Sequence, residues 1–482
     1  MTTFRVPKVL LLSAALAAAS LHAGEARIHG FFVQPELGYG ATDYQSFNSQ
    51  NEWNAWMKQM ADLGAEMIFY QWTMHYQQES ALDWYTDPAT AYPSAPSPGD
   101  YAHYDTHLAP LNGVSSWSWS RPTSWPGTPS QGGKESVTYL LDAAQANGMK
   151  AWLGLYLCEG DTSNFCNWWK SQDIDDVIDP GDSIAIEYHV QRSIQVAQEL
   201  ISIYGEHEGL GGLYMSIEPA NITFMGPETR KVLASAIDRV AKAVHTAKPG
   251  LKLSICPFFN TALSTAEEFG SVWEYVIEHS DLDVLMLQDG VGVEPQTLTA
   301  SQDLVSPWYA ALRAAADKKG IEFWGNSELF TNLGTRQNVN LIPSTAEKVT
   351  LQLETEAPYV DKFVCFAFSY LDPTKNTFAA LDLSQRTALY NGLKDYWETW
   401  KANHQTSVAA RPAAVGSWRA VPGGALVRWN GKAAGWALFD EAGRRVTQGL
   451  LEPGDNVLGW GPVAPGRYFW KAGSETRSVG LF

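Results

Sequence analysis

The sequence predicts an α/β fold, a (β/α)8 TIM barrel followed by a small C-terminal β-sandwich. The first observation is that strand-like apolar runs alternate with amphipathic helical stretches eight times between residues 28 and 404, which is the repeat of a TIM barrel. The second is that no Gly-rich dinucleotide-binding turn follows the first run, whereas a doubly wound open sheet usually carries one. The third is a series of short strand-like pieces with turn residues after residue 414, typical of a β-sandwich.

The predicted barrel strands are short apolar runs, as expected for parallel strands buried on both faces. They occupy residues 28–36, 66–72, 150–157, 209–218, 251–259, 283–290, 321–328 and 362–370. Helical spacing separates them, most clearly in three stretches, at 51–65, 227–250 and 383–404. The middle stretch begins with Pro227 and closes at Gly250, the usual asymmetry of helix start and stop signals.

The N-terminus has the pattern of a signal peptide, which we place at residues 1–23. Arg5 and Lys8 precede the apolar run 9–21, and small residues follow around Ala23. This run is too short to cross a bilayer, and no later stretch approaches the ~20 apolar residues that a membrane-spanning helix needs. We therefore expect an exported protein that is secreted, periplasmic or held at the cell surface, with no membrane span.

The rest of the chain is expected to form two domains. The barrel occupies residues 27–404, and the turn to Ala, Ser and Pro at 405–414 indicates a linker. Residues 415–482 form the β-sandwich, of an accessory or sorting type. We expect a monomer.

Composition restricts the classes of ligand. The net charge of −18 argues against a nucleic-acid partner, because phosphate backbones require clustered Lys and Arg. Twenty Trp and twenty Tyr residues offer flat faces that stack on sugar rings, although many of them must belong to the core. No phosphate-binding Gly-rich loop and no paired Cys or His ligands of a metal site are found. We expect neither a cofactor nor a metal.

The four cysteines divide into two pairs of different character. Cys158 and Cys166 flank a short loop segment, and in an oxidising compartment they are expected to form a disulfide. Cys256 and Cys365 lie inside apolar runs and are expected to be buried thiols.

Two of the apolar runs break off at a glutamate. Glu218 ends the fourth run and Glu328 ends the seventh. In TIM barrels, catalytic residues come from the carboxyl ends of the strands. Glycoside hydrolysis uses a pair of carboxylates placed on either side of the scissile bond. For either glutamate alone, the capping of a loop or an ion pair with an arginine is an equally good interpretation.

With these residues the sequence resembles the large clan of retaining glycoside hydrolases that carry catalytic glutamates at the ends of strands four and seven. The resemblance covers residues 27–404 and implies that Glu218, followed by Pro219, is the acid/base and that Glu328 is the nucleophile. The phrases GFFVQPE, FYQWT and LQDGVG also resemble a group of poorly characterised bacterial barrel proteins assigned to glycoside hydrolysis. One departure is Ile217, where the clan has an Asn that binds the substrate 2-hydroxyl.

Further polar and aromatic residues near the predicted strand ends are candidates for substrate binding. Asn221 and Gln288 are the alternatives for the missing Asn, and Asp289 is either a rival nucleophile or a residue that holds a sugar hydroxyl or a positively charged neighbour. Trp324 and Asn326 alternate with Glu328 and are expected to share its side of the strand. The remaining candidates are Gln34, Gln71, Trp72 and Tyr370. Neutral amides suit contacts to hydroxyls, and aromatic rings suit stacking.

The function that these residues predict is retaining hydrolysis of an oligo- or polysaccharide, because long aromatic loops follow strands two and three. In such a pair we expect the pKa of Glu218 to be raised relative to that of Glu328, since one carboxyl must be protonated while the other is charged. Two alternatives stay open. One is a non-catalytic glycan-binding barrel, which Ile217 favours, and the other is a surface protein whose function lies in the terminal sandwich.

Overall fold

The computed structural model describes most of the barrel and the strands of the C-terminal unit. The described residues are 24–33, 50–77, 99–102, 104, 106, 108, 136–158, 180–293, 298–335, 340–374, 381–409, 415–421, 424–429, 434–440, 445–459, 466–472 and 475–481. The chain divides into two compact units, residues 1–397 and 398–482. Among the described residues no helix is both long and apolar enough to cross a membrane.

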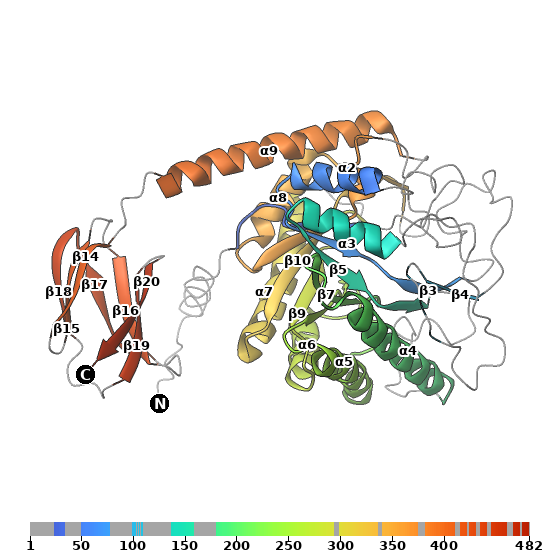
Figure 1. The fold of residues 1–482 in the computed structure, drawn as a ribbon, viewed down its shortest axis with the longest axis horizontal. Coiled ribbons are helices and arrows are strands. Elements are labelled where there is room, and N and C mark those ends of the chain that lie inside the picture. Colours follow the sequence, from blue (N-terminus) through green and yellow to red (C-terminus); the bar gives the residue numbers. More distant parts are fainter. Residues whose placement is uncertain are drawn as a thin grey trace, which may run out of the picture. The chain divides into compact units, whose positions relative to one another are not determined.

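The first unit is built on a closed eight-stranded barrel, which confirms the predicted fold class (Figure 1). In chain order its strands are β1 (Gly30–Val33), β2 (Met67–Tyr70), β5 (Lys150–Gly154), β7 (Leu210–Met215), β8 (Lys252–Ile255), β9 (Val284–Gln288), β10 (Glu322–Glu328) and β13 (Lys362–Phe366). Every neighbouring pair is parallel, and β1 closes the barrel by pairing with both β2 and β13. All eight carboxyl ends therefore open on one face of the barrel.

Aromatic side chains fill the inside of the barrel. Trp324 of β10 packs against Trp152 of β5 and Phe69 of β2, with ring centroids 5.3 and 6.2 Å apart. Since β10 pairs with neither of these strands, the contacts must cross the lumen. Phe32 of β1 likewise meets Tyr214 of β7 at 5.3 Å. The lumen is thus a packed core, and any site for a ligand has to lie above it, at the carboxyl ends.

A glycine on β7 makes room for this aromatic layer. A Cβ atom at Gly212 would lie 2.4 Å from the six-membered ring of Trp152. No real Cβ contact is that short, so the indole of Trp152 occupies the space that a side chain at position 212 would need.

Helices surround the barrel, one after each strand (Figure 1). They are α2 (Gln50–Ala61), α3 (Ser136–Ala146), α4 (Pro180–Tyr204), α5 (Pro227–Ala247), α6 (Ala266–Glu278), α7 (Leu298–Lys319), α8 (Ala346–Glu356) and α9 (Leu383–Ala409). Pro227 is the first residue of α5, as predicted, because proline at this position loses no helical hydrogen bond. The last helix extends to Ala409, so residues 405–409 are helical where the sequence predicted a linker.

Short additional strands lie at the carboxyl face of the barrel. β3 (Met74–Gln77) pairs with β4 (Gly99–Ala102) and β6 (Tyr156–Cys158), and β11 (Phe330–Asn332) pairs with β12 (Leu341–Pro343). A short 3-10 helix, Phe368–Tyr370, follows β13. The β11–β12 hairpin directly follows β10 and thereby lies beside the end of the seventh strand.

The second unit contains two antiparallel sheets, compatible with the predicted sandwich. One consists of β14 (Val415–Val421), β15 (Gly424–Trp429) and β18 (Gly454–Gly459). The other consists of β17 (Arg445–Leu451), β16 (Ala434–Asp440), β19 (Gly466–Ala472) and β20 (Glu475–Leu481). Trp436 and Leu438 of β16 are buried, while Leu450 and Val457 are exposed.

We expect Gly212→Ala to lower the free energy of unfolding by about 1–3 kcal/mol, because the new methyl group overlaps the Trp152 ring. Urea unfolding of both single variants and of the double variant with Trp152→Phe measures this. The smaller phenyl ring should relieve the overlap, so the double variant should lose less stability than the sum of the two single variants. Strict additivity would show that the two side chains do not compete for the same space.

Candidate active site

The two glutamates singled out from the sequence lie at the carboxyl face. Glu328 is the last residue of β10, the seventh barrel strand, and Glu218 follows Met215, the last residue of β7, the fourth. Alternation along β10 puts Glu328 on the side of Trp324, which points into the lumen. Glu218 lies three residues beyond the last residue of β7, and its carboxylate accepts a hydrogen bond from Gln288 at the end of β9.

Glu218 is half-buried and is held by an amide from a neighbouring strand. Nε2 of Gln288, the last residue of β9, donates to Glu218 Oε1 at 3.2 Å and to the carbonyl of Cys256 at 3.3 Å. Gln288 is itself partly exposed. It therefore links the ends of β7, β8 and β9, and its side chain remains accessible from the carboxyl face.

Glu328 is more deeply buried, with 6% of its surface exposed. The backbone N–H groups of Gly292 and Val293 donate to one of its oxygens, Oε2, at 2.6 and 2.8 Å. Both donors belong to the loop that follows β9. Two charge-assisted hydrogen bonds to the same atom fix the orientation of this carboxylate.

Burial raises the pKa of Glu328 to about 8, and the nearby charge of Asp289 contributes in the same direction. The two backbone N–H groups and the Lys348 ammonium oppose this rise without cancelling it. Sequence reasoning expected Glu328 to be the charged member of the pair, with the raised pKa on Glu218. The pKa of Glu328 is itself raised, because a nearly enclosed carboxylate loses its hydration.

A buried thiol lies within electrostatic range of both glutamates. Burial raises the pKa of Cys256 above its ordinary range, and the charges of Glu218 and Glu328 both add to the rise. Asn326 Nδ2 donates to Cys256 Sγ at 3.2 Å, while its Oδ1 is buried without a hydrogen bond from the described part of the chain. Cys256 and Cys365 are buried free thiols, as predicted. Both carboxyl groups therefore lie near this thiol.

Asp289 does not face this region. It is 1% exposed, and its Oδ2 accepts a hydrogen bond of 2.5 Å from Gln352 on α8. Its Oδ1 accepts from the backbone N–H groups of Val291 and Glu328, at 3.1 and 3.3 Å. As the neighbour of the inward-facing Gln288, it points outward to the helix layer. The prediction that Asp289 is a nucleophile or a sugar ligand is therefore wrong.

Trp324 is also not positioned to contact a substrate. It is the third residue of β10, 2% exposed, with its Nε1 donating to Glu322 Oε2 at 3.0 Å. This indole lies at the amino end of the strand, inside the packed lumen. The predicted alternation was right, but Trp324 is core because it starts too early in the strand to reach the barrel mouth.

Asn221 is committed to the loops that flank it. Its Nδ2 donates to the carbonyl of Asn260 and to Ser264 Oγ, at 2.8 and 2.7 Å, and its Oδ1 accepts from the Asn260 N–H at 2.8 Å. The residue is 3% exposed. Both of its amide protons are thus used to join the loops after β7 and β8, and none is left for a sugar.

The remaining predicted residues have different positions. Gln71 follows β2, and its carbonyl accepts a hydrogen bond of 2.7 Å from Ser216 Oγ. Trp72 and Tyr370 are each 7% exposed, and the Tyr370 ring packs 4.9 Å from that of Phe330. Gln34, Cys166 and the side chain of Cys158 lie outside the described residues. The signal peptide, 1–23, lies outside them too.

The sequence analysis did not single out four polar residues that lie behind Glu328. Lys348, Gln352 and Glu356 come from α8, and Asn332 ends β11. Glu356 is buried next to Asp289, and burial raises the pKa of both carboxyl groups. Lys348, Gln352 and Glu356 recur at every fourth position of α8, so they share one helix face, which for three polar residues could have signalled a buried polar contact.

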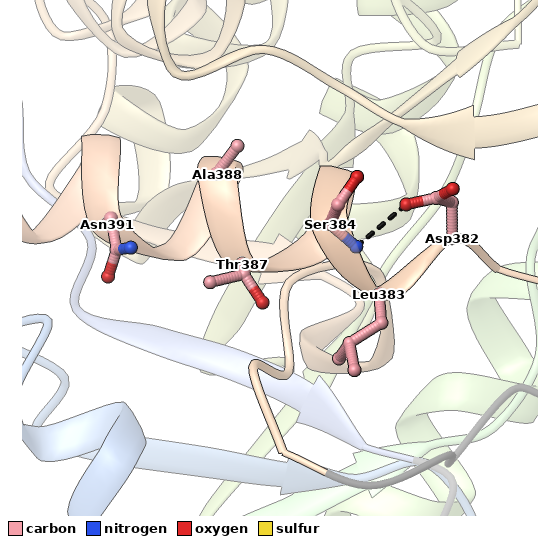
Figure 2. A pocket seen from close by; sticks show the side chains of 6 residues that line it. All are labelled: Asp382, Leu383, Ser384, Thr387, Ala388 and Asn391. Atoms are coloured by element: carbon pink, nitrogen blue, oxygen red, sulfur yellow. Dashed lines mark hydrogen bonds between the residues drawn. The ribbon is translucent and has the colours of Figure 1, made fainter.

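Two other features of the described residues carry less weight. No group of three His, Cys, Asp or Glu side chains there could hold a metal ion. An open hollow of about 730 Å³ lies at the start of α9, lined by Asp382, Leu383, Ser384, Thr387, Ala388 and Asn391 (Figure 2). Asp382 accepts the Ser384 backbone N–H there at 2.7 Å, which caps the helix. Neither of the two glutamates lines this hollow.

Comparison with known proteins assigns the barrel to a family. Residues 28–376 match the family described as "Domain of unknown function (DUF4434)". The chain belongs to this family. A search of curated proteins found no match.

Solved structures with a similar fold include glycoside hydrolases. A candidate alpha-L-fucosidase from Bacteroides thetaiotaomicron VPI-5482 is 17% identical, with a TM-score of 0.50 over 83% of this chain and 97% of that one. An exo-beta-1,4-mannosidase from Opitutaceae bacterium strain TAV5 is 15% identical, with a TM-score of 0.44 over 79% and 60%. An endo-beta-1,4-mannanase from Thermotoga petrophila is 11% identical, with a TM-score of 0.44 over 96% and 98%. At these identities the likeness to the first structure establishes a shared fold.

The buried Glu328 predicts a pH-dependent stability. Its pKa is about 8 in the folded chain and 4.5 as an ordinary glutamate, so the folded state binds the extra proton between these values. Stability from this group is complete below pH 4.5 and is lost as the pH rises through 8. Relative to Glu328→Gln, the wild type should therefore lose on the order of a few kcal/mol across this window.

Urea unfolding of the two proteins at pH 5, 7 and 9 measures that difference. Glu322→Gln, at the other end of the same strand, is the matched control and should follow the wild type. A difference between wild type and Glu328→Gln that stays constant with pH would show that Glu328 ionises normally.

Proposed function

We propose that this protein is an exported glycoside hydrolase that cleaves an oligo- or polysaccharide with retention of configuration, with Glu218 as acid/base and Glu328 as nucleophile. The observation that carries the proposal is the placement of these two carboxyls at the ends of the fourth and seventh barrel strands, both within electrostatic range of Cys256. The fold shared with the candidate fucosidase supports the reaction class by analogy only.

The proposed reaction has two displacement steps. Glu218 gives its proton to the glycosidic oxygen while a carboxylate oxygen of Glu328 bonds to the anomeric carbon, and the bond to the leaving group breaks. Glu218, now charged, then removes a proton from water, whose oxygen displaces Glu328 from the anomeric carbon. Two inversions give retention.

Gln288 is the residue best placed to assist this pair. Its amide touches Glu218, is partly exposed and belongs to a strand between those of the two glutamates. Because Ile217 is fully buried and Asn221 is committed to its loops, Gln288 is the remaining candidate for binding a hydroxyl next to the reacting carbon.

Export and substrate length rest on the sequence. The N-terminal pattern of residues 1–23 supports export, and the aromatic content of the loops after strands two and three supports a groove for several sugar units. The β-sandwich would then serve as an accessory or sorting domain.

The alternative is a glycan-binding barrel without catalysis. Ile217 favours it, since an apolar residue stands where the clan binds the substrate 2-hydroxyl. The nucleophile variant separates the two functions, because binding does not require a carboxylate that can form a covalent bond.

Glu328→Gln should reduce turnover of any aryl glycoside that the wild type cleaves by a factor on the order of 10⁴ or more, as the loss of a nucleophile does. Steady-state kinetics on a panel of 2,4-dinitrophenyl glycosides measures this, with Glu322→Gln on the same strand as the control that keeps activity. Trapping with the matching 2-deoxy-2-fluoro glycoside should label Glu328 in a peptide map. Unchanged turnover in Glu328→Gln, or a label on another residue, would contradict the assignment.

Glu218→Gln should show a loss that depends on the leaving group. A dinitrophenolate leaves without a proton, so formation of the covalent intermediate should change little, whereas an alkyl glycoside should react about 10²–10⁴-fold more slowly. Pre-steady-state kinetics with both substrates tests this. An equal loss for the two leaving groups would rule out Glu218 as the acid.

A further inference from the structure

The two oxygens of Glu328 are not equivalent. Oε2 accepts the N–H groups of Gly292 and Val293, at 2.6 and 2.8 Å. Oε1 accepts no hydrogen bond from the described part of the chain, and it is not among the polar atoms buried there without a partner. One oxygen is therefore anchored, and the other is open to whatever occupies the barrel mouth.

The peptide groups that anchor Oε2 are held from behind. Lys348 Nζ donates to the carbonyl of Val291 at 3.0 Å. The backbone N–H of Asn332 donates to the carbonyl of Gly292 at 2.8 Å, and its Nδ2 donates to that of Val293 at 3.0 Å. All three carbonyls of this loop segment thus point away from Glu328, so the intervening N–H groups must point towards it.

The residues behind the loop are themselves fixed. Asn332 is 3% exposed, and its Oδ1 accepts the N–H groups of Gly334 and Asn340 at 2.8 and 2.9 Å. Lys348 is 7% exposed, and its ammonium also donates to Thr331 Oγ1 at 3.2 Å. These contacts leave neither side chain free to rotate away from the loop.

Asp289 joins the loop after β9 to the backbone of Glu328 in β10. Its Oδ1 accepts the N–H of Val291 in the loop and the N–H of Glu328 in the strand. Gln352 Nε2 donates to Asp289 Oδ2 and to the Glu328 carbonyl, at 2.5 and 3.2 Å. The loop and the backbone of Glu328 consequently keep a fixed spacing.

Glycine is the only residue type that fits at position 292 without displacing the Glu328 carboxylate. A Cβ atom there would lie 2.8 Å from Glu328 Oε2 and 2.6 Å from the Phe330 carbonyl. The absence of a side chain allows the peptide to approach the carboxylate closely.

We propose that the loop segment Asp289–Val293, backed by Asn332, Lys348 and Gln352, is a positioning device that anchors Glu328 by Oε2 and presents Oε1 as the attacking oxygen. This inference rests on the proposed function. In the first step Oε1 forms the bond to the anomeric carbon, the glycosidic bond breaks, and the leaving oxygen takes its proton from Glu218. Gly292, Asn332 and Lys348 touch no reacting atom and are positioning residues.

The charges around Glu328 come from several elements. Asp289 at the end of β9 raises its pKa, and Lys348 on α8 lowers it. The charge of Asp289 also raises the pKa of Glu356 on α8, and the charges of Glu328 and Glu218 both raise the pKa of Cys256, which follows β8. Weakening the two hydrogen bonds to Oε2, or removing the Lys348 ammonium, therefore raises the pKa of Glu328.

The test measures that ionisation directly in the full-length protein. Carbon-13 NMR of protein labelled at the glutamate carboxyl carbon gives the titration midpoint of Glu328, whose signal is identified by its loss in Glu328→Gln. Gly292→Ala and Lys348→Met should each raise the midpoint by roughly half a unit to one unit. Two matched controls should leave it unchanged. Gly320→Ala strains a left-handed backbone at the amino end of β10, and Lys319→Met removes an ammonium that binds the carbonyls of Ile277 and Ser280.

Kinetics on the responsive dinitrophenyl glycoside give the second readout. Gly292→Ala should lower kcat by about 10–100-fold with KM changed less than about threefold, because displacing the reacting oxygen by a fraction of an ångström affects the chemical step. The acidic limb of its kcat/KM profile should move up with the NMR midpoint. If Gly292→Ala does not fold, Lys348→Met alone decides.

The outcomes are distinguishable. Folded variants whose midpoint and kcat equal those of the wild type overturn the positioning device. Midpoints that rise in the two controls as well show a general loosening of the fold and overturn it too. If the midpoint shifts as expected but the wild type cleaves no glycoside of the panel, the anchor is real, and attack by Oε1 falls together with the proposed reaction.

Discussion

Alternation of side chains on a closed sheet is the constraint on which the rest of this structure depends. Every second residue of a barrel strand must point at the axis, and the axis of an eight-stranded barrel has room only for a packed core. Here that core is aromatic, with Trp152 meeting Trp324 and Tyr214 meeting Phe32 across it. Inward-facing polar side chains that can reach the barrel mouth are thereby those at the last inward position of a strand or beyond it. Gln288 and Glu328 occupy such positions, and the outward neighbour of the former, Asp289, is turned towards the helices.

The same alternation explains why acids are buried on both sides of β10. Glu328 faces inward, while Ser327 faces outward and donates to Glu356 on α8 at 3.1 Å. Asp289 lies between these layers, and each of the three carboxyl groups has a pKa raised by burial. The single nearby ammonium of the described residues, Lys348, has its own pKa lowered by the same burial. One cation against three acids favours a shared proton among them at neutral pH, so the cluster avoids carrying three full charges.

The features predicted correctly from the sequence are those that short-range patterns encode. Apolar runs gave the strand count, and the count placed Glu218 fourth and Glu328 seventh, because each strand is a local feature of the chain. Sequence reasoning failed where position within a strand decides. Trp324 shares the inward side with Glu328 but lies four residues earlier, at the floor of the barrel. Asp289 could have been excluded from the alternation alone, once Gln288 was assigned inward. Asn332 and Lys348 act on a loop about 40 and 57 residues away in the chain, and no local pattern reports such a contact.

The burial of Glu328 bears on the choice between catalysis and simple sugar binding. An enclosed carboxylate with a pKa near 8 destabilises the folded chain at neutral pH and above. A lectin gains nothing from this, since an exposed carboxylate or an amide such as that of Gln288 binds hydroxyls without the loss. A nucleophile does gain once it is deprotonated, because a poorly hydrated carboxylate oxygen held in one orientation is closer to its reactive geometry. The two peptide N–H groups that bind Oε2 reduce this loss of stability and leave Oε1 accessible. The burial and anchoring of this one carboxyl at the barrel mouth therefore fit the proposed catalytic function better than the binding one.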